Sequence, residues 1–309
     1  MTVLHSLARQ PLRPGRDFVL ILSCPDQVGI VHAVTGVLAA HRVTITESQQ
    51  FEDAVSRTFF MRVRFRAKVM RAQDTQDTPD TDDVDISAIK ADLGPVTERF
   101  QMRWAVHDLA HPTRTIIMVS TAAHCLADLL HRHLAGTLNI DPVAVVSNHT
   151  DLSAIAAMYG VPFHHLPVSA DTKLAAERSL LDLVELHQVD LVVLARYMQV
   201  LSEQVTNALP GHVINIHHSF LPGFKGARPY HQAHERGVKL IGATAHYVTP
   251  ELDEGPIIEQ DITRVHHGYT PHDLSEAGQD VETQVLARAV RWHTEHRVFL
   301  NGRSTVVLR

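Results

Sequence analysis

The sequence predicts an α/β protein of two units, a small N-terminal βαββαβ unit over residues 17–108 and a larger C-terminal unit over residues 112–309. A chain of 309 residues is long for one domain and suits two. Up to residue 110, the apolar periodicity follows the order strand, helix, strand, strand, helix, strand. Beyond it, short apolar segments such as LVVLA at 191–195 alternate with amphipathic helices, which indicates a doubly wound, mostly parallel sheet.

The N-terminal unit begins with the apolar segment FVLILSC at 18–24, which predicts a buried strand. A loop and a helix follow over 25–42, where valines recur at helical spacing. The segments VTITESQQF and SRTFFMRVRF alternate in the manner of two half-buried strands. A second helix over 86–100 and a strand over 101–109 complete the ferredoxin-like order.

The segment between the third expected strand and the second expected helix, residues 74–85, contains six Asp and no basic residue. Such a composition predicts a solvated loop. A calcium site is the alternative, but the spacing lacks the glycine and the distal glutamate of an EF-hand loop.

The turn PDQVGI at 25–30 carries Asp26 and Gly29 just before the first helix. Together with the βαββαβ order, this turn resembles the ACT domain, a small regulatory module. The resemblance implies an amino-acid effector held at Asp26 and Gly29, where a glycine lets backbone N–H groups approach a carboxylate. The alternative is a structural turn in a domain that only mediates assembly. In either case we expect a homo-oligomer, because edge strands are commonly covered by pairing.

The C-terminal unit is predicted from alternating elements. Strands are expected at 115–119, 143–147, 163–168, 191–195 and 213–217, with helices between them, for example at 124–136 and 173–188. Strand-like segments at 241–248 and 256–262 and a helix over about 271–296 close the chain. Doubly wound sheets bind ligands at the carboxyl ends of their strands.

One predicted strand ends in two polar side chains, in the segment HVINIHH. Alternation places Asn215 and His217 on the same face, at the edge of the sheet where ligands bind. An amide can donate to a developing oxyanion and an imidazole can transfer a proton near neutral pH. Asp253, in the later turn of VTPELDEGPII, could accept a proton from water. The alternative is that Asn215 and Asp253 cap loops and His217 is a hydrogen-bonded core histidine.

Two longer motifs favour the chemical interpretation. NIHHSFLPGFKGARPYHQA and GATAHYVTPELDEGPIIEQ resemble the formyltransferase family that uses 10-formyltetrahydrofolate. The resemblance covers residues from about 112 to the end of the chain and implies that Asn215, His217 and Asp253 are catalytic. It also implies that backbone around the segment ARYMQVLS and the turn before Asp253 holds the pterin ring. The folate-binding positions carried over are Met198, Gln199, Val200, Leu201 and Thr249. For Met198 and Leu201, ordinary packing is an equally good interpretation.

The family contains transferases and hydrolases, and two features favour a hydrolase. The turn STAAHCLADLL, from Ser120 onward, lacks the glycines that cradle the phosphate of glycinamide ribonucleotide in the corresponding transferase. His218 stands where that transferase has proline. With an ACT-like unit in front, the organisation implies hydrolysis of 10-formyltetrahydrofolate to formate and tetrahydrofolate, with the formate serving purine synthesis and balancing one-carbon pools. The alternatives are a transferase with an amine acceptor and a folate or amino-acid sensor without turnover.

Histidine is abundant, with 23 in the chain, so a metal was weighed. His231 and His234, the adjacent His217 and His218, and His246 are the candidates. A catalytic zinc needs three convergent ligands. The chemistry of the family that the chain resembles needs no metal. We therefore expect no metal and no cofactor, with the folate as the substrate.

Composition excludes other classes of partner. The chain is 45% hydrophobic and 20% charged, with a net charge of −6 and no basic run, so no nucleic-acid partner is expected. No run of 18 apolar residues occurs, so no membrane association is expected. Cys24 and Cys125 form no disulfide framework, and the N-terminus has no apolar leader. These features favour a cytoplasmic location.

Overall fold

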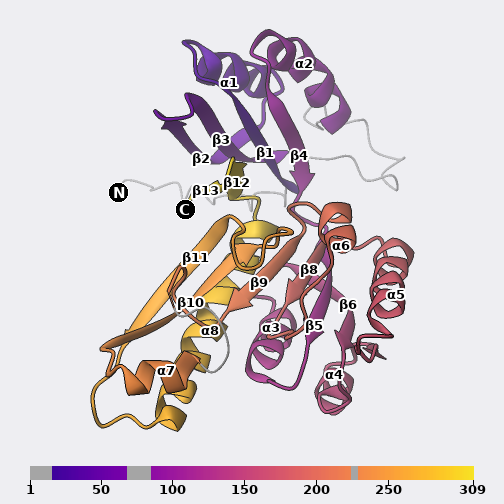
Figure 1. Cartoon of the computed structure of the whole chain (residues 1–309). Coiled ribbons are helices and arrows are strands. Elements are labelled where there is room, and N and C mark those ends of the chain that lie inside the picture. The colour runs from indigo at the N-terminus through magenta and orange to yellow at the C-terminus, as the bar shows by residue number, and fades with distance from the viewer. Residues whose placement is uncertain (1–15, 68–84, 224–228) are drawn as a thin grey trace, which may run out of the picture. The chain divides into compact units, whose positions relative to one another are not determined.

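The computed structural model describes residues 16–67, 85–223 and 229–309, and the chain divides into two compact units, Met1–His111 and Pro112–Arg309 (Figure 1). Most of the acidic segment at 74–85 lies outside the described residues. Its last residue, Asp85, is described and lies exposed directly before α2 (Ile86–Arg99). Its side chain accepts a hydrogen bond from the backbone N–H of Ser87 and caps the next helix.

The first unit has the predicted order of elements, and the ferredoxin-like prediction is confirmed. The elements are β1 (Arg16–Pro25), α1 (Ile30–Ala40), β2 (Thr44–Asp53), β3 (Thr58–Ala67), α2 (Ile86–Arg99) and β4 (Arg103–Asp108). The sheet is antiparallel, in the order β2-β3-β1-β4. Its core joins the two helices to one face of the sheet, with Val34 and Leu38 from α1 and Ile89 and Leu93 from α2.

The prediction that β2 and β3 are both half-buried is wrong. β3 pairs with a strand on each side and is buried almost throughout, on both of its faces. One of its buried residues is Arg62, whose guanidinium forms an ion pair with Glu47 of β2. β2 lies at the edge of the sheet and is mostly exposed. Alternation of residue types cannot separate a central strand from its edge neighbour.

The second unit is built on a seven-stranded sheet in the order β11-β10-β9-β8-β5-β6-β7. The strands β5 to β9 run parallel, and β10 and β11 are antiparallel additions, so the prediction of a doubly wound, mostly parallel sheet is confirmed. The strands are β5 (Thr113–Val119), β6 (Ile140–Ser147), β7 (Phe163–His165), β8 (Leu191–Leu194), β9 (Val213–His217), β10 (Leu240–Tyr247) and β11 (Ile257–Arg264). The longer helices are α3 (His124–Leu134), α5 (Lys173–Leu186) and α8 (Pro271–Thr294).

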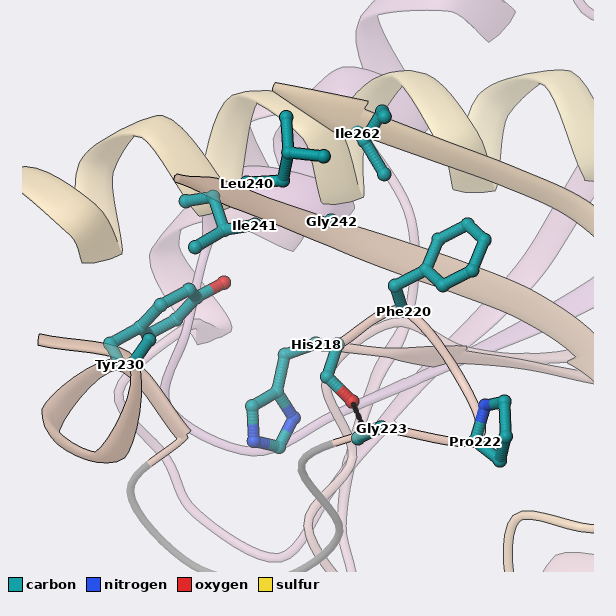
Figure 2. A pocket seen from close by; sticks show the side chains of 11 residues that line it. His218, Phe220, Pro222, Gly223, Tyr230, Leu240, Ile241, Gly242 and Ile262 are labelled. Atoms are coloured by element: carbon teal, nitrogen blue, oxygen red, sulfur yellow. Dashed lines mark hydrogen bonds between the residues drawn. The ribbon is translucent and has the colours of Figure 1, made fainter. Parts of the chain in front are cut away.

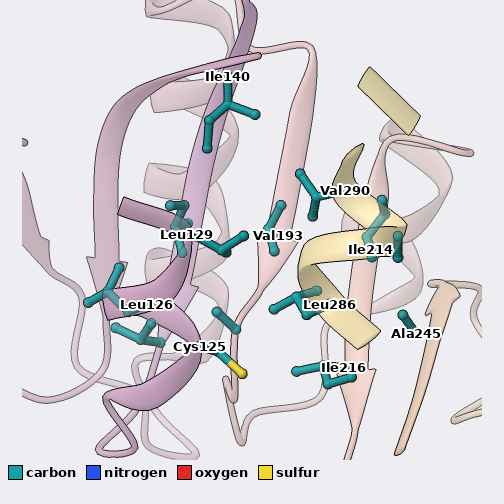
Figure 3. Packing of buried hydrophobic residues seen from close by; sticks show 14 of the residues in the cluster. Cys125, Leu126, Leu129, Ile140, Val193, Ile214, Ile216, Ala245, Leu286 and Val290 are labelled. Carbon is teal, nitrogen blue, oxygen red and sulfur yellow. The ribbon is translucent and has the colours of Figure 1, made fainter. Parts of the chain in front are cut away.

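The two faces of this sheet have separate apolar layers. On one face, α3 and α8 pack against strand residues such as Val193 and Ile214, through Leu129, Leu286 and Val290 among others (Figure 3). On the other face, Leu180 of α5 packs against residues of β5 and β8. Successive side chains of each fully apolar strand point to opposite faces, so one strand contributes to both layers. This is expected for a sheet that is covered on both sides.

The sequence reasoning gave no bounds for several short helices. α4 (Ser153–Met158) and α6 (Glu203–Ala208) are among the helices expected between the strands, and α7 (Pro229–Glu235) is the helix expected around His231 and His234. The hairpin of β12 (Val298–Asn301) and β13 (Ser304–Val307) was missed. The strand predicted at 163–168 is only three residues long. Elements of three to seven residues carry too little periodicity to be recognised.

Two further observations concern membrane crossing and the two cysteines. Within the described ranges, no helix combines the length and the apolar character that crossing a membrane requires. Cys24 and Cys125 are free thiols in separate cores, and burial raises the pKa of Cys24 to about 11.

Candidate active site

The end of β9 brings Asn215 and His217 to one face of the sheet, as predicted. Both line a cavity of about 350 Å³ at the carboxyl edge of the parallel strands. Asp253, from the turn between β10 and β11, lines the same cavity. The three residues singled out from the sequence are therefore neighbours in space.

The turn that carries Asp253 is held in an unusual conformation. Asp253 has a φ of +56°, in the left-handed region that aspartate tolerates better than most residues. Two residues later, Gly255 lies against the backbone of Tyr247, and a Cβ at this position would come within 1.7 Å of the Tyr247 carbonyl oxygen. The glycine is therefore required for the turn to close on β10 and to direct the carboxylate toward β9.

His217 and Asp253 form the central contact of the site. Nδ1 of His217 lies 3.3 Å from Oδ1 of Asp253, and both side chains are largely buried. The hydrogen bond from His217 holds the pKa of Asp253 below its usual range, although burial acts in the opposite direction. Nε2 of His217 is buried and has no hydrogen-bond partner among the described residues. His217 is thus not the fully satisfied core histidine of the alternative interpretation.

A further residue, His246, completes the polar lining and was considered only as a metal ligand from the sequence. Its Nδ1 lies 2.8 Å from the carbonyl oxygen of Tyr247, so that nitrogen carries the hydrogen. Burial lowers the pKa of His246, which favours the neutral ring. Nε2 then accepts a hydrogen bond from Nδ2 of Asn215, at 3.3 Å. This bond orients the amide and leaves its second N–H for another acceptor.

The segment predicted to hold the pterin ring lines the same cavity. Met198, Gln199, Val200, Leu201 and Thr249 all contribute to its wall. Met198 is 58% exposed, so the interpretation of Met198 as ordinary packing is wrong. Leu201 is 8% exposed and belongs to a core cluster, so packing accounts for most of its side chain. The backbone N–H of Met198 donates to Oγ of Ser120, which fixes the start of the segment.

The turn at the start of α3 is the one that lacks glycines for holding a phosphate. Ala123 is the N-cap residue and offers no side-chain hydrogen bond to the helix. His124 begins the helix, and its Nε2 lies 2.8 Å from a carboxylate oxygen of Glu282 in α8. Glu282, a fully buried charged residue, was not identified from the sequence.

The predicted effector residues lie in the first unit. Gly29 is the N-cap of α1 with a φ of +99°, and the backbone N–H of Asp26 donates to the carbonyl of Arg57. Both residues are exposed. A positive φ explains the glycine, and effector binding at this turn stays a prediction.

The described residues form two groups of three potential metal ligands. One contains His124, Cys125 and Glu282, and the other contains His272, Asp273 and Glu276. Neither group includes the histidines that the sequence singled out as candidates.

Comparison with known proteins shows which families the two units are similar to. The formyl transferase family model matches residues 113–290 and the ACT domain model matches residues 18–85. A formyltetrahydrofolate deformylase from Corynebacterium sp. (strain P-1) is 51% identical over 291 residues, which cover 94% of this chain and 98% of that protein. The Escherichia coli K12 protein of the same name is 39% identical and covers 99% of this chain and 100% of its own length.

Two solved structures differ in how much of this chain they resemble. A formyltetrahydrofolate deformylase from Burkholderia mallei ATCC 23344 has a TM-score of 0.86 at 51% identity, covering 95% of this chain and 100% of its own. A glycinamide ribonucleotide transformylase 1 from Symbiobacterium toebii has a TM-score of 0.61 at 30% identity. It covers only 66% of this chain but 97% of its own.

Proposed function

We propose a catalytic centre for this chain, which belongs to the formyltetrahydrofolate deformylase family and hydrolyses 10-formyltetrahydrofolate to formate and tetrahydrofolate. The centre consists of Asn215, His217 and Asp253. The observation that supports this most directly is the 3.3 Å contact between His217 and Asp253, beside Asn215 in one cavity. The product formate would then enter purine synthesis and the one-carbon pool.

The arrangement suggests a sequence of proton movements. In the ion-paired state, His217 carries hydrogen on both ring nitrogens, with Nδ1–H facing Asp253 and Nε2–H left for the substrate. The carboxylate of Asp253 accepts a proton from the attacking water as the water oxygen bonds to the formyl carbon. The free N–H of Asn215 donates to the oxyanion that forms. Nε2–H then protonates N10 as the C–N bond breaks, which yields formate and tetrahydrofolate.

The five folate-binding positions are proposed from the same cavity. Its wall between Met198 and Leu201 and around Thr249 combines exposed apolar side chains with backbone polar groups. Such a lining suits a flat heteroaromatic ring with hydrogen-bonding edges.

The main test concerns the acceptor. With 10-formyltetrahydrofolate alone, we expect tetrahydrofolate and formate in equal amounts. A saturating level of glycinamide ribonucleotide should leave both rates unchanged, because no glycine-lined turn is available at Thr121, Ala122 and Ala123 to hold its phosphate. Formylated glycinamide ribonucleotide as the main product, with little formate in its absence, would instead establish a transferase.

The first unit is proposed to be a regulatory domain over residues 17–108, and the second a catalytic domain over residues 112–309. Asp26 and Gly29 are exposed at the start of α1, where a small amino acid could place its carboxylate. A panel of amino acids tested by calorimetry and by formate release would identify the effector. A flat response in both measurements would leave this domain with a role in assembly alone.

A homo-oligomer and a cytoplasmic location complete the proposal. The outer strand β2 presents a mostly exposed edge of ten residues, which a second copy could pair with. Both cysteines are unpaired thiols, as is usual in a reducing compartment. Sedimentation as a monomer at micromolar concentration would contradict the oligomer.

A further inference from the structure

A buried ionic cluster lies beside the catalytic centre and is not used by the mechanism above. Its centre is the carboxylate of Glu282, which is 0% exposed in α8. One oxygen accepts from the hydroxyl of Tyr230 at 2.7 Å, and the other lies 2.8 Å from Nε2 of His124 and 3.3 Å from Nε of Arg196. Burial raises the pKa of Glu282, but the hydrogen bond from His124 and the charge of Arg196 outweigh it, so the carboxylate stays ionised.

Arg196 connects this cluster to the substrate cavity. It follows β8 with a φ of +67°, a left-handed conformation that is costly for an arginine. Its side chain is 17% exposed and it lines the same cavity as Asn215, His217 and Asp253. Strained backbone persists where the surroundings hold it, and here the side chain of Arg196 is paired with Glu282 while its carbonyl accepts a hydrogen bond from the backbone N–H of Ser120.

His218 lies between the cluster and the catalytic centre. Its ring stacks on that of His217, with centroids 5.1 Å apart and an interplanar angle of 29°. On another side it lies 6.4 Å from the ring of Tyr230. Burial, and then the positive charge of Arg196, lower the pKa of His218 to about 4. The ring is therefore neutral at physiological pH, with one nitrogen that donates and one that accepts.

The position of His218 also limits where its nitrogens can act. It lines the catalytic cavity and a second, apolar cavity of about 370 Å³. Figure 2 shows both ring nitrogens on the side of the ring away from Leu240, Ile241 and Ile262 of the apolar cavity. Leu240, Ile241 and Ile262 have no polar side-chain atom to pair with these nitrogens, and a water in the catalytic cavity, which His218 also lines, can supply a partner.

We propose that His218 is a fourth catalytic residue, which accepts a hydrogen bond from the attacking water and thereby directs that water at the formyl carbon. The inference rests on the proposed catalytic centre. Asp253 takes one hydrogen of the water, and the accepting nitrogen of His218 holds the other, so the oxygen lone pair points at the substrate. No proton is transferred to His218, and the proton balance of the reaction is unchanged. Tyr230, beside the ring, and Arg196, whose charge favours the neutral ring, are positioning residues, and Glu282 and His124 act by holding Arg196 and Tyr230 in place.

Neutrality is essential to this role. A protonated ring could not accept a hydrogen bond, and it would repel the positive charge on His217 during the reaction. Among the described residues, the titratable or charged groups around His218 are His217 on β9, Arg196 after β8, Tyr230 on α7, Glu282 on α8 and Asp253 in the β10–β11 turn. Burial is the main cause that keeps the ring unprotonated, and the charge of Arg196 and then that of His217 act in the same direction, against Glu282 and Asp253.

The test replaces His218 by phenylalanine, which keeps a ring for stacking on His217 and Tyr230 and removes both nitrogens. We expect kcat to fall at least ~10-fold, the effect of one lost hydrogen bond in the transition state, with KM within about twofold of the wild type. His218→Gln retains an acceptor and should recover part of the loss. The matched control is His131→Phe, at an exposed position of α3, with kcat unchanged.

A second measurement separates positioning of water from a general loss of structure. Hydroxylamine attacks the formyl group without an oriented water and gives formohydroxamate and tetrahydrofolate. In His218→Phe, formate production should fall more than formohydroxamate production, so the ratio of hydroxamate to formate rises at least ~10-fold. An equal fall in both products, or a kcat within twofold of the wild type, would overturn the proposal. A wild-type protein that releases no formate would instead refute the proposed catalytic centre.

Discussion

Oδ1 of Asp253 lies 3.3 Å from Nδ1 of His217, a contact that joins the last residue of β9 to the turn between β10 and β11. The same carboxylate oxygen is 3.8 Å from Nε2 of His246, which accepts from Asn215. One left-handed aspartate therefore lies within 3.8 Å of two of the histidines that line the cavity. Its position depends on backbone geometry as much as on the side chain.

Asp253→Asn should reduce kcat by about 10²–10⁴, because the amide cannot accept the proton of the attacking water. Asparagine tolerates the left-handed conformation, so this variant tests the chemistry without added backbone strain. Formate release at saturating substrate is the measurement, with circular dichroism to verify folding. Near-normal turnover would remove Asp253 from the catalytic centre.

Gly255→Ala should reduce kcat through the backbone alone. The new Cβ cannot remain 1.7 Å from the carbonyl oxygen of Tyr247, so the turn must move and carry Asp253 away from His217. Gly36→Ala in α1 is the control, because a Cβ there meets nothing within 4 Å and alanine favours a helix by ~0.5–1 kcal/mol. Unchanged turnover in both variants would show that the turn does not position the carboxylate.

His218 should make stability depend on pH between about 6.5 and 4. Its pKa is about 4 in the folded protein against an ordinary value of 6.5, so the unfolded chain binds the proton first as the pH falls. The free energy of unfolding should therefore decrease on acidification through this window, by at most about 1.4 kcal/mol per pH unit from this group. Urea unfolding at pH 7 and pH 5 should show a smaller decrease for His218→Gln. An identical decrease in the variant would contradict the lowered pKa.

The Asp253 carboxyl contributes in a separate window. Its pKa is held below the ordinary value of 3.8, so the stability it adds is present above that value and is lost as the pH falls through the folded pKa. The two effects do not overlap above pH 4, which makes the comparison of the His218 variant with the wild type straightforward to interpret.

Met198 and Leu201 should respond differently to alanine. Met198 is 58% exposed in the cavity wall, so Met198→Ala should raise KM for the folate and leave the free energy of unfolding nearly unchanged. Leu201 is packed in a core cluster, and Leu201→Ala should cost about 2–5 kcal/mol of stability. Steady-state kinetics and urea unfolding of the two variants provide the comparison. Equal effects on KM would mean that both side chains contact the substrate.

The parts of the structure that follow from local pattern were predictable from the sequence. Apolar alternation located β9 with its observed bounds and placed Asn215 and His217 on one face. The long helix α8 and the short apolar strands of the second unit have periodicity over enough residues to be recognised.

The contacts that depend on distant pairing were not predictable. His246 reaches Asn215 because β10 pairs antiparallel with β9 in a register that sets the two residues opposite each other. Glu282 meets Arg196 and Tyr230 because α8 packs against β9, β10 and β11 and beside α7. Neither register nor helix docking is encoded in a short window of residue types. The burial of a glutamate in particular runs against composition rules unless its partners are known.

The apolar cores of the two units have no residue in common, since one is built from positions before residue 107 and the others from positions after residue 115. In calorimetric terms, we expect the chain to unfold as two cooperative blocks, one for each unit. A ligand that binds only the first block raises the melting temperature of that block by mass action. Any shift that it produces in the second transition therefore measures the coupling free energy between the blocks. By reciprocity, binding of the folate to the second block changes the affinity of the first block for its ligand by the same coupling free energy.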